Sequence, residues 1–383
     1  MSNTRDSVVL IASACAAIVM SSWWLYKRRK SSHVPTVTIV GDIFCDVIAT
    51  NVENLPSVWG TDTVVRAPIT VHSGGSGLNT SVWLSRLCAS DPVSDVLVKI
   101  ARNFQTSDKG GFESIVEDTL HEAGIEIVDP IAPSDFPVGT CICLSGESDR
   151  SFVTYRGGNS NFGFNNFKLD ELIYLNQQHL HIAGYYNCPG LWAENAEAFI
   201  NLCRSKCPQM TISLNPQYGE GWGGNIQKLL PLVDFFICNS VEAQGIASGG
   251  SGQILDVVES AVKLVKQHAC PCAIITLGAD GALVARSGTY QGEGTAESEE
   301  LGCTIQRALC KELLESPILD TVGVGDAFCG GFLSQVVKHR LKPSSPGLID
   351  AVRFGCACGT AALTVIGGST FPGIETVRAS QID

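Results

Sequence analysis

The chain has 383 residues, of which 45% are hydrophobic, so it is long enough for two or three domains or for one large α/β domain with a substantial core. Its formal net charge of −12 makes it a poor candidate for binding nucleic acid. The 16 cysteines are scattered, without a CxxC pair or a neighbouring histidine cluster, which excludes zinc spacing and favours buried thiols in a reducing compartment.

The N-terminal segment resembles a membrane anchor. Residues 8–26 carry no charge and are about as long as a membrane-spanning helix needs to be, and the basic run 27–30 follows directly. The positive-inside rule then predicts a single-pass protein with a cytosolic body, in the ER, plasma or an organelle outer membrane. The alternatives are a buried helix or a targeting segment whose removal leaves a soluble protein. We therefore divide the chain into an anchor and linker, 1–33, and a folded body, 34–383.

The body alternates between strand-like and helical stretches. A β-branched run within 36–49 predicts a first strand that enters a Gly-Asp turn, and further strand-like runs occur at 94–101, 179–184, 210–215, 233–239 and 272–278. Helical stretches lie between them, at 78–88, 111–123, 191–204 and 254–268. This alternation predicts an α/β fold with a doubly wound, mainly parallel sheet flanked by helices.

Two stretches break the alternation. Residues 136–158 have the pattern of a β-hairpin, and residues 50–72 are strand-prone and punctuated by proline. Together they predict a small antiparallel flap over the carboxyl edge of the main sheet, where it would exclude water from a site.

The most informative stretch is 319–337, "LDTVGVGDAFCGGFLSQVV". It predicts a glycine turn followed by a helix whose apolar residues recur every fourth position. A glycine turn at a helix N-terminus is an anion site, and a carboxylate there, Asp326, suits a base that takes a proton from a group attacking a phosphate. The simpler alternative is that Asp326 only caps the helix.

Four features in a fixed order carry a family resemblance: Asp46 after the first strand, "SGGSGLN" at 73–79, "NSVE" at 239–242 and "DTVGVGDAF" at 320–328. With this order and spacing, the chain resembles the ribokinase-like (PfkB-type) carbohydrate kinases over nearly all of residues 36–372. The resemblance implies a ribokinase-like kinase domain at 34–383, with lid segments at about 50–72 and 136–158.

The resemblance implies transfer of the γ-phosphoryl group of ATP to a hydroxyl of a sugar or sugar-like alcohol. Asp326 would be the general base, and the N–H groups of Gly323, Val324 and Gly325 would form the anion hole. The family usually has alanine where Val324 stands, but the backbone donor is retained.

The resemblance also implies metal positions. Asn239 and Glu242 match the motif that orders hydrated Mg²⁺ near the phosphates, although the same spacing also fits a helix capping box. Asp320, with the carbonyl of Val322, matches positions that hold potassium in some relatives.

The remaining implied site residues bind substrate and nucleotide. On the substrate side they are Asp46, Gly74, Gly75, Asn79 and Arg156; on the nucleotide side they are Asn239, Glu242, Thr276, Gly278 and Gly281. Arg156 would indicate an anionic or ketose substrate unless it only forms a structural salt bridge. The helix expected within 354–368 would flank the adenine. Phe44 departs from ribokinases proper, which tend to have asparagine there.

Three further expectations stay open. A nucleoside kinase of the same fold shares these motifs, and Phe152 or Tyr155 in the flap would then stack on the base. A catalytically idle scaffold or regulator is a second alternative, although such proteins generally lose the base or the glycines, which this chain keeps. Relatives also form homodimers by exchanging the lid, so a second copy of this chain is an expected partner.

Overall fold

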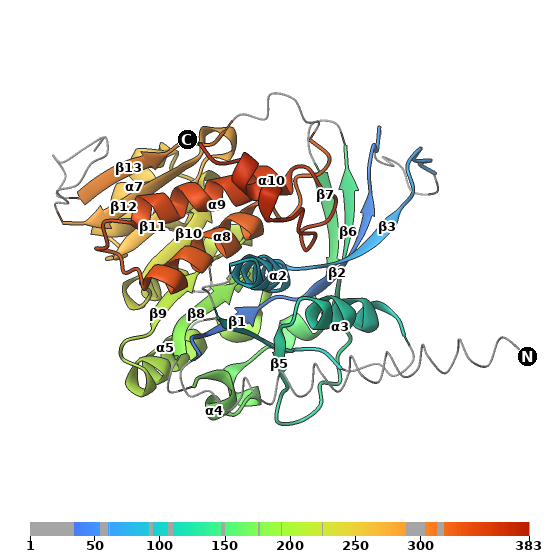
Figure 1. Ribbon diagram of the computed structural model, residues 1–383, viewed down its shortest axis with the longest axis horizontal. Coiled ribbons are helices and arrows are strands. Elements are labelled where there is room, and N and C mark those ends of the chain that lie inside the picture. The colour runs from blue at the N-terminus through green and yellow to red at the C-terminus, as the bar shows by residue number, and fades with distance from the viewer. Residues whose placement is uncertain are drawn as a thin grey trace, which may run out of the picture.

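The computed structural model describes residues 34–53, 60, 62–91, 95–105, 110–146, 150–174, 177–192, 194–223, 225–288, 303–311 and 318–382. These residues form a nine-stranded main sheet, helices on its two faces and a separate four-stranded sheet (Figure 1). The helices are α2 (Ser76–Ala89), α3 (Phe112–Glu122), α4 (Leu169–Leu172), α5 (Glu194–Lys206), α6 (Ser240–Ala247), α7 (Val257–Lys266), α8 (Val324–His339), α9 (Leu348–Ala362) and α10 (Ile374–Ala379).

The main sheet is mixed and has the strand order β13-β12-β11-β10-β9-β8-β1-β4-β5. Its strands are β1 (Thr36–Gly41), β4 (Leu97–Ala101), β5 (Glu126–Val128), β8 (Gln177–Ala183), β9 (Thr211–Leu214), β10 (Phe235–Asn239), β11 (Cys272–Thr276), β12 (Ala282–Ser287) and β13 (Cys303–Ala308). The neighbouring strands from β5 to β11 in this order are parallel to one another. Beyond β11, β12 pairs antiparallel with β11, and β13 pairs antiparallel with β12. The carboxyl ends of the parallel strands therefore meet at one edge, where α/β proteins place their sites.

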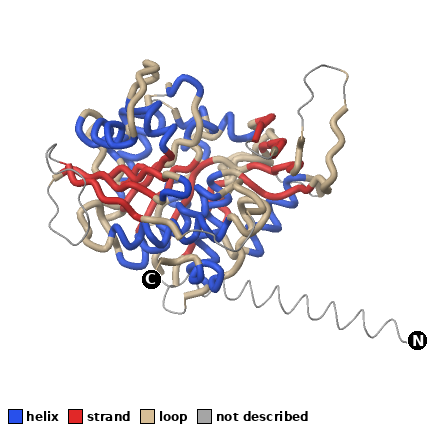
Figure 2. Tube along the Cα trace, turned by 90° about the horizontal axis from the view of Figure 1, so that it is seen from above, coloured by secondary structure: helices blue, strands red, loops and turns tan. Residues whose placement is uncertain are grey.

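Alternation along the buried strands builds a hydrophobic core on each face of the main sheet. In β10, Phe235 and Ile237 pack in the cluster that contains α2, α3, α8 and α9, whereas Phe236 and Cys238 pack with α5, α6 and α7. A strand turns successive side chains to opposite faces, so a continuous apolar run feeds both cores. Figure 2 shows the strands between the two groups of helices.

The second sheet has the order β3-β2-β6-β7 and lies at the right of Figure 1, away from β11, β12 and β13. Its strands are β2 (Phe44–Ala49), β3 (Thr70–Gly74), β6 (Gly139–Ser145) and β7 (Arg150–Tyr155). β6 and β7 form an antiparallel hairpin within residues 136–158, and β2 pairs with both β3 and β6. We call β2, β3, β6 and β7 the lid sheet.

The strand and the Gly-Asp turn predicted within 36–49 are present, but the residues after the turn form a second strand, which belongs to the lid sheet. This run is two strands: β1 ends at Gly41 in the main sheet, and β2 begins at Phe44 in the lid sheet. The chain therefore passes from one sheet to the other within two residues. Part of the lid segment predicted at 50–72, namely 54–59 and 61, lies outside the described residues.

The described residues contain no helix that is long and apolar enough to cross a bilayer. The longest of the described helices, α8, has 16 residues, whereas a spanning helix needs about 20. The predicted membrane helix at 8–26 itself lies outside the described residues. We therefore correct the fold prediction by removing the transmembrane helix from it, and we do not retain the single-pass localisation that depended on that helix.

Candidate active site

A pocket of about 460 Å³ lies at the carboxyl edge of the main sheet, where strand ends, the N-termini of α2, α6 and α8, and the lid sheet converge. Most of the site residues predicted from the sequence line it: Asp46, Gly75, Asn79, Arg156, Asn239, Glu242, Thr276, Gly323, Val324, Gly325 and Asp326. The fold thus brings residues from positions 46 to 326 into one cavity.

Four predicted site residues are not among those that line the pocket. Gly74 lies behind Asp46, and a Cβ at that position would be 1.9 Å from Asp46 Oδ2. Gly278 and Gly281 flank a short turn after β11, both with positive φ. Asp320 binds backbone N–H groups instead: Oδ1 accepts from Val322 and Oδ2 from Gly367, both at 2.9 Å.

The turn at 323–325 has the geometry that the glycines predict. Gly323 is the N-cap of α8 with φ 75°, and a Cβ there would be 2.2 Å from Gly368 Cα. Only glycine fits this close approach without strain. A Cβ on Gly325 would meet no atom within 4 Å. The helix N-terminus therefore opens directly into the pocket, as an anion site requires.

Asp326 is 6% exposed and lies in the first turn of α8. Its Oδ1 accepts a hydrogen bond from Ser76 Oγ at 2.7 Å, and its Oδ2 accepts one from Asn79 Nδ2 at 2.8 Å. Gln217 Nε2 lies 3.4 Å from Oδ1. The carboxylate is thus held by side chains of α2 and of the loop after β9.

Asn79 lines the pocket and has an amide oxygen that Asp326 does not use. Because an ionised carboxylate only accepts, Nδ2 must face Asp326, which leaves Oδ1 on the other side. This Oδ1 is buried and has no hydrogen-bond partner among the described residues. A buried acceptor without a partner is costly, and a substrate hydroxyl would satisfy it.

Asp46 lies across the pocket from α8 and is 8% exposed. Burial, together with the charges of the Asp42, Asp326 and Asp320 carboxyls, raises its pKa to about 7. The ionised form is therefore unfavourable in the free protein, and a ligand that donates hydrogen bonds to it would stabilise that form.

Asn239 and Glu242 form a complete capping box at the start of α6. Glu242 N donates to Asn239 Oδ1 at 2.9 Å, and Asn239 N donates to Glu242 Oε2 at 3.0 Å. Burial raises the pKa of Glu242 to about 7, an effect that Asn239 opposes. The capping box is therefore present, and its carboxylate also faces the pocket.

The described residues hold no cluster of three His, Cys, Asp or Glu side chains that would enclose a metal ion. A single buried carboxylate beside an amide fits Mg²⁺ that keeps most of its waters, since this ion is seldom enclosed by protein ligands alone.

Strand alternation decides which lid residues face the pocket. In the lid sheet, Asp46 pairs with Cys141, and Cys141 pairs with Thr154; all three line the pocket. Phe152, two residues before Thr154, also lines it. Arg156 follows β7, is exposed and makes no ion pair with any described residue, so the structural salt bridge considered for it is absent from this part of the chain.

Sequence reasoning missed several polar pocket residues. Asp42 accepts a hydrogen bond from Asn187 Nδ2 at 2.6 Å on Oδ2 and from Gly77 N at 3.0 Å on Oδ1, and burial raises its pKa. Asn215 and Gln217 follow β9. Each of these residues stands just after a strand, which was the available signal, because such positions meet at the carboxyl edge.

Comparisons with known proteins give a family match and a fold match. A model of the pfkB family carbohydrate kinase matches residues 35–376. The adenosine kinase of Schizophyllum commune is 30% identical over 210 residues, which cover 53% of this chain and 57% of that protein. Adenosine kinase 1 of Arabidopsis thaliana is 25% identical over 247 residues, which cover 62% of this chain and 64% of that protein.

The matched stretches thus span less than two thirds of both adenosine kinases. Among solved structures, ribokinase from Giardia lamblia superposes with a TM-score of 0.69 at 18% identity, covering 90% of this chain and 99% of that chain. This likeness shows a shared fold.

Proposed function

Because the chain belongs to the pfkB family of carbohydrate kinases, as the match over residues 35–376 shows, we propose that it phosphorylates a hydroxyl group of a sugar or sugar-like substrate with ATP. The membership confirms the resemblance found in the sequence. The observation that carries the proposal is the position of Asp326, whose carboxylate stands at an open helix N-terminus in the same pocket as Asp46.

In this proposal Asp326 takes the proton of the attacking hydroxyl. The backbone N–H groups of Gly323, Val324 and Gly325 hold the charge on the transferring phosphoryl group, because the catalysis of phosphoryl transfer rests on positioning and electrostatics. Asp46 and the Oδ1 of Asn79 accept hydrogen bonds from other substrate hydroxyls. Gly74 and Gly75 allow the backbone to come close to the substrate.

Nucleotide and cations would occupy the other end of the pocket. Thr276 ends β11, Gly278 and Gly281 follow it, and the three would lie beside the nucleotide. Asn239 and Glu242 would orient the waters of a Mg²⁺ ion, whose charge offsets that of the phosphates. Asp320 already binds two backbone N–H groups, and K⁺ near it would be held together with the carbonyl of Val322.

We place the kinase domain at residues 34–383, with lid segments at about 50–72 and 136–158. The outward face of the lid sheet supports a homodimer. Val71, Ile142 and Val153 are 41%, 41% and 62% exposed, and all three are on the face opposite to Asp46. A second copy of this chain would cover them.

A nucleoside kinase is the second candidate. It is favoured by Phe44 and Phe152, two aromatic side chains that line the pocket, and by the adenosine kinases among the relatives. An aromatic ring beside the pocket can stack on a base, whereas a sugar without a base would leave it unused.

The test is phosphate transfer by the full chain with Mg²⁺-ATP and a panel of ribose, fructose, other ketoses, sugar acids and nucleosides. Asp326→Asn should lower turnover by at least ~10²-fold while ATP binding is kept, since a general base contributes on that scale. Asp118→Asn, on the exposed side of α3, is the matched control and should keep full activity.

Each outcome of the panel decides between the candidates. Turnover of a sugar supports the first proposal, and turnover of nucleosides alone supports the second. An active Asp326→Asn variant contradicts the role of the base. If ATP binds and no acceptor is phosphorylated, the chain is an idle relative and the proposed function is wrong.

A further inference from the structure

The hydroxyl of Ser76 lies between two acceptors. Its Oγ is 2.7 Å from Asp326 Oδ1 and 3.5 Å from Asn215 Oδ1. A serine hydroxyl carries one hydrogen and rotates freely, so it donates to only one of the two at a time. Ser76 is 3% exposed and Asn215 is 7% exposed, so bulk water does not compete for this hydrogen.

The orientation of Asn215 is fixed by a second contact. Its Nδ2 donates to the carbonyl of Ile237 at 3.2 Å, which leaves Oδ1 turned toward Ser76. Backbone bonds hold the residue in place as well, because Asn215 N donates to Ile182 O at 2.8 Å. Asn215 therefore offers a permanent acceptor to the Ser76 hydroxyl.

The protonation state of Asp326 decides which acceptor the hydroxyl uses. The ionised carboxylate attracts the hydrogen strongly, and the shorter distance agrees with this. Protonation at Oδ1 removes the negative charge and weakens this oxygen as an acceptor, so the Ser76 hydroxyl then gives its hydrogen to Asn215 Oδ1.

We propose that Ser76 is a positioning residue for proton transfer, whose hydroxyl holds the ionised Asp326 in place and turns to Asn215 when Asp326 takes the substrate proton. The proposal rests on the proposed kinase function. It gives the Ser76 hydroxyl an acceptor in both states of the base, Asp326 when the carboxyl is ionised and Asn215 when it is protonated.

The step balances as follows. The substrate O–H bond breaks and its proton forms a new O–H bond with Asp326 Oδ1. The electron pair left on the substrate oxygen forms the bond to the γ-phosphorus, and the bond from that phosphorus to the bridging oxygen breaks to release ADP. The O–H bond of Ser76 stays intact throughout and only changes its acceptor.

Other titratable groups also act on Asp326. Asp46 on β2 and Glu242 in α6 are carboxyls whose charges repel its ionised form, and the Cys329 thiol lies one turn further along α8. Arg156 lines the same pocket from the lid side. The neighbouring carboxylates disfavour the ionised form of Asp326, whereas the hydrogen bond from Ser76 favours it. Loss of this hydrogen bond should therefore raise the pKa of Asp326.

The first experiment compares Ser76→Ala with Ser81→Ala in the full chain. Ser81 is a matched control in the same helix, because it is also buried and its Oγ donates to the carbonyl of Gly77 at 2.6 Å. Ser76→Ala should lower kcat by about 10-fold or more, leave both KM values within about twofold, and move the acidic limb of the kcat–pH profile upward. An unchanged kcat and limb would overturn the proposal.

Asn215→Ala tests the second acceptor. It should lower kcat without moving the acidic limb upward, because the Ser76 hydroxyl still donates to the ionised carboxylate. The double variant should be no slower than Ser76→Ala by more than about twofold, since both residues act in one chain of hydrogen bonds. Fully additive losses would contradict the shared role.

A measurement without turnover separates this proposal from the proposed function. The Asp326 carboxyl band is titrated by infrared difference spectroscopy and assigned by its loss in Asp326→Asn. Ser76→Ala should raise the pKa of that band, and an unchanged pKa refutes the hydrogen-bonding role. If the wild-type chain phosphorylates no acceptor, the kinase proposal fails, and this titration still decides whether Ser76 controls Asp326.

Discussion

Asp46, the proposed ligand of the substrate hydroxyls, is a buried carboxyl whose ionisation is unfavourable. Its folded-state pKa of about 7 lies above the ordinary value of 3.8. Between these two values the folded protein binds more protons than the unfolded chain, so the free energy of unfolding falls as pH rises through this window. A carboxylate that destabilises the free protein at neutral pH is typical of a residue kept for binding.

Asp46→Asn should therefore raise the melting temperature, and more so at pH 8 than at pH 4. The same change should weaken binding of the phosphoryl-acceptor substrate at pH 8 by at least about tenfold, because a neutral amide replaces the ionised carboxylate that accepts its hydrogen bonds. Thermal denaturation and calorimetric titration at both pH values measure these effects, with Asp118→Asn as the exposed control. A variant less stable than the wild type at pH 8 would show that the charge of Asp46 is not costly.

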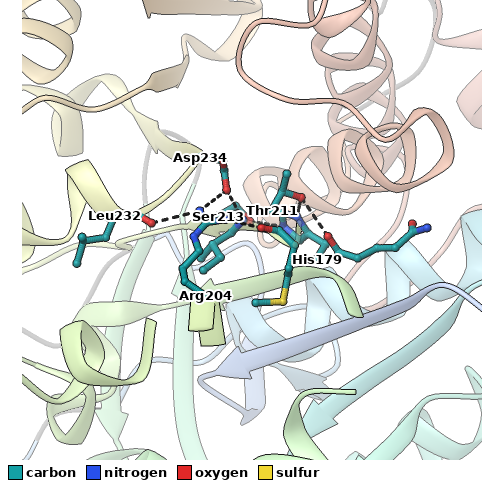
Figure 3. Close-up of polar contacts among 9 residues, drawn as sticks. His179, Arg204, Thr211, Ser213, Leu232 and Asp234 are labelled. Atoms are coloured by element: carbon teal, nitrogen blue, oxygen red, sulfur yellow. Dashed lines mark hydrogen bonds and ion pairs between the residues drawn. The ribbon is translucent and has the colours of Figure 1, made fainter. Parts of the chain in front are cut away.

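At the scale of single elements, β8 carries two buried histidines that the proposed chemistry does not use. His179 Nδ1 is 2.7 Å from Thr211 Oγ1, and its Nε2 is 2.7 Å from Ser213 Oγ (Figure 3). Ser213 Oγ is also 2.7 Å from His181 Nδ1. Burial lowers the pKa of His179 well below its ordinary value and that of His181 to about 3.

Both imidazoles are therefore neutral in the folded protein, and the pH dependence of stability follows. Below the ordinary pKa of 6.5, the imidazoles bind protons in the unfolded chain but not in the folded one, so the stability that they contribute falls as pH falls below 6.5. Each histidine contributes about 1.4 kcal/mol per pH unit in this window.

The prediction concerns the contribution of the histidines alone, because Asp46 and Glu242 change the free energy of unfolding in the opposite direction between pH 5.5 and pH 7. Compared with the wild type, His181→Gln should have a free energy of unfolding at pH 5.5 that is higher relative to its value at pH 7, measured by urea denaturation, because glutamine does not titrate. His339→Gln, on the exposed end of α8, is the control and should leave the difference unchanged. An equal loss of acid sensitivity in both variants would locate the effect outside β8.

The elements were largely predictable because their signals are local. The runs at 233–239 and 272–278 are β10 and β11, since short apolar runs bounded by polar or glycine residues are typical of buried parallel strands. The Gly-Asp turn that ends β1 was predictable, but the change of sheet after it was not, because an apolar pattern resumes at Ile43. Only pairing with β3 and β6, distant in the sequence, separates β2 from the main sheet.

The pocket residues were predictable only where a local motif contains them. The glycine turn and Asp326 were visible because one continuous motif contains them. Asp42, Asn187 and Asn215 were missed because each is a single polar residue after a strand, and only the strand order brings them together. The hydrogen bonds from α2 to Asp326 were not predictable either, because Ser76 and Asn79 are 250 and 247 positions away from Asp326 in the sequence.

At the scale of the whole molecule, the proposed homodimer depends on the apolar residues of the outward face of the lid sheet. Val153→Asp places a charge among exposed apolar side chains of three strands, so it should shift a dimer to monomer in sedimentation velocity. Ile254→Glu, which alters a residue that is 88% exposed and outside the lid sheet, should leave the sedimentation coefficient unchanged. A wild-type chain that stays monomeric at all concentrations contradicts the homodimer.

The two-residue passage from β1 to β2 also determines how the lid sheet can move. A tether this short permits little translation, and both of its residues are held in place: Asp42 accepts a hydrogen bond from Gly77 at the start of α2, and Ile43 is hydrogen-bonded to the side chain of Asn159. Any movement of the lid sheet therefore moves Asp46 relative to α2, the helix whose side chains hydrogen-bond to Asp326. Binding of the substrate by Asp46 and alignment of the base Asp326 would then occur in the same movement. A partner bound to the outer face of the lid sheet would affect both.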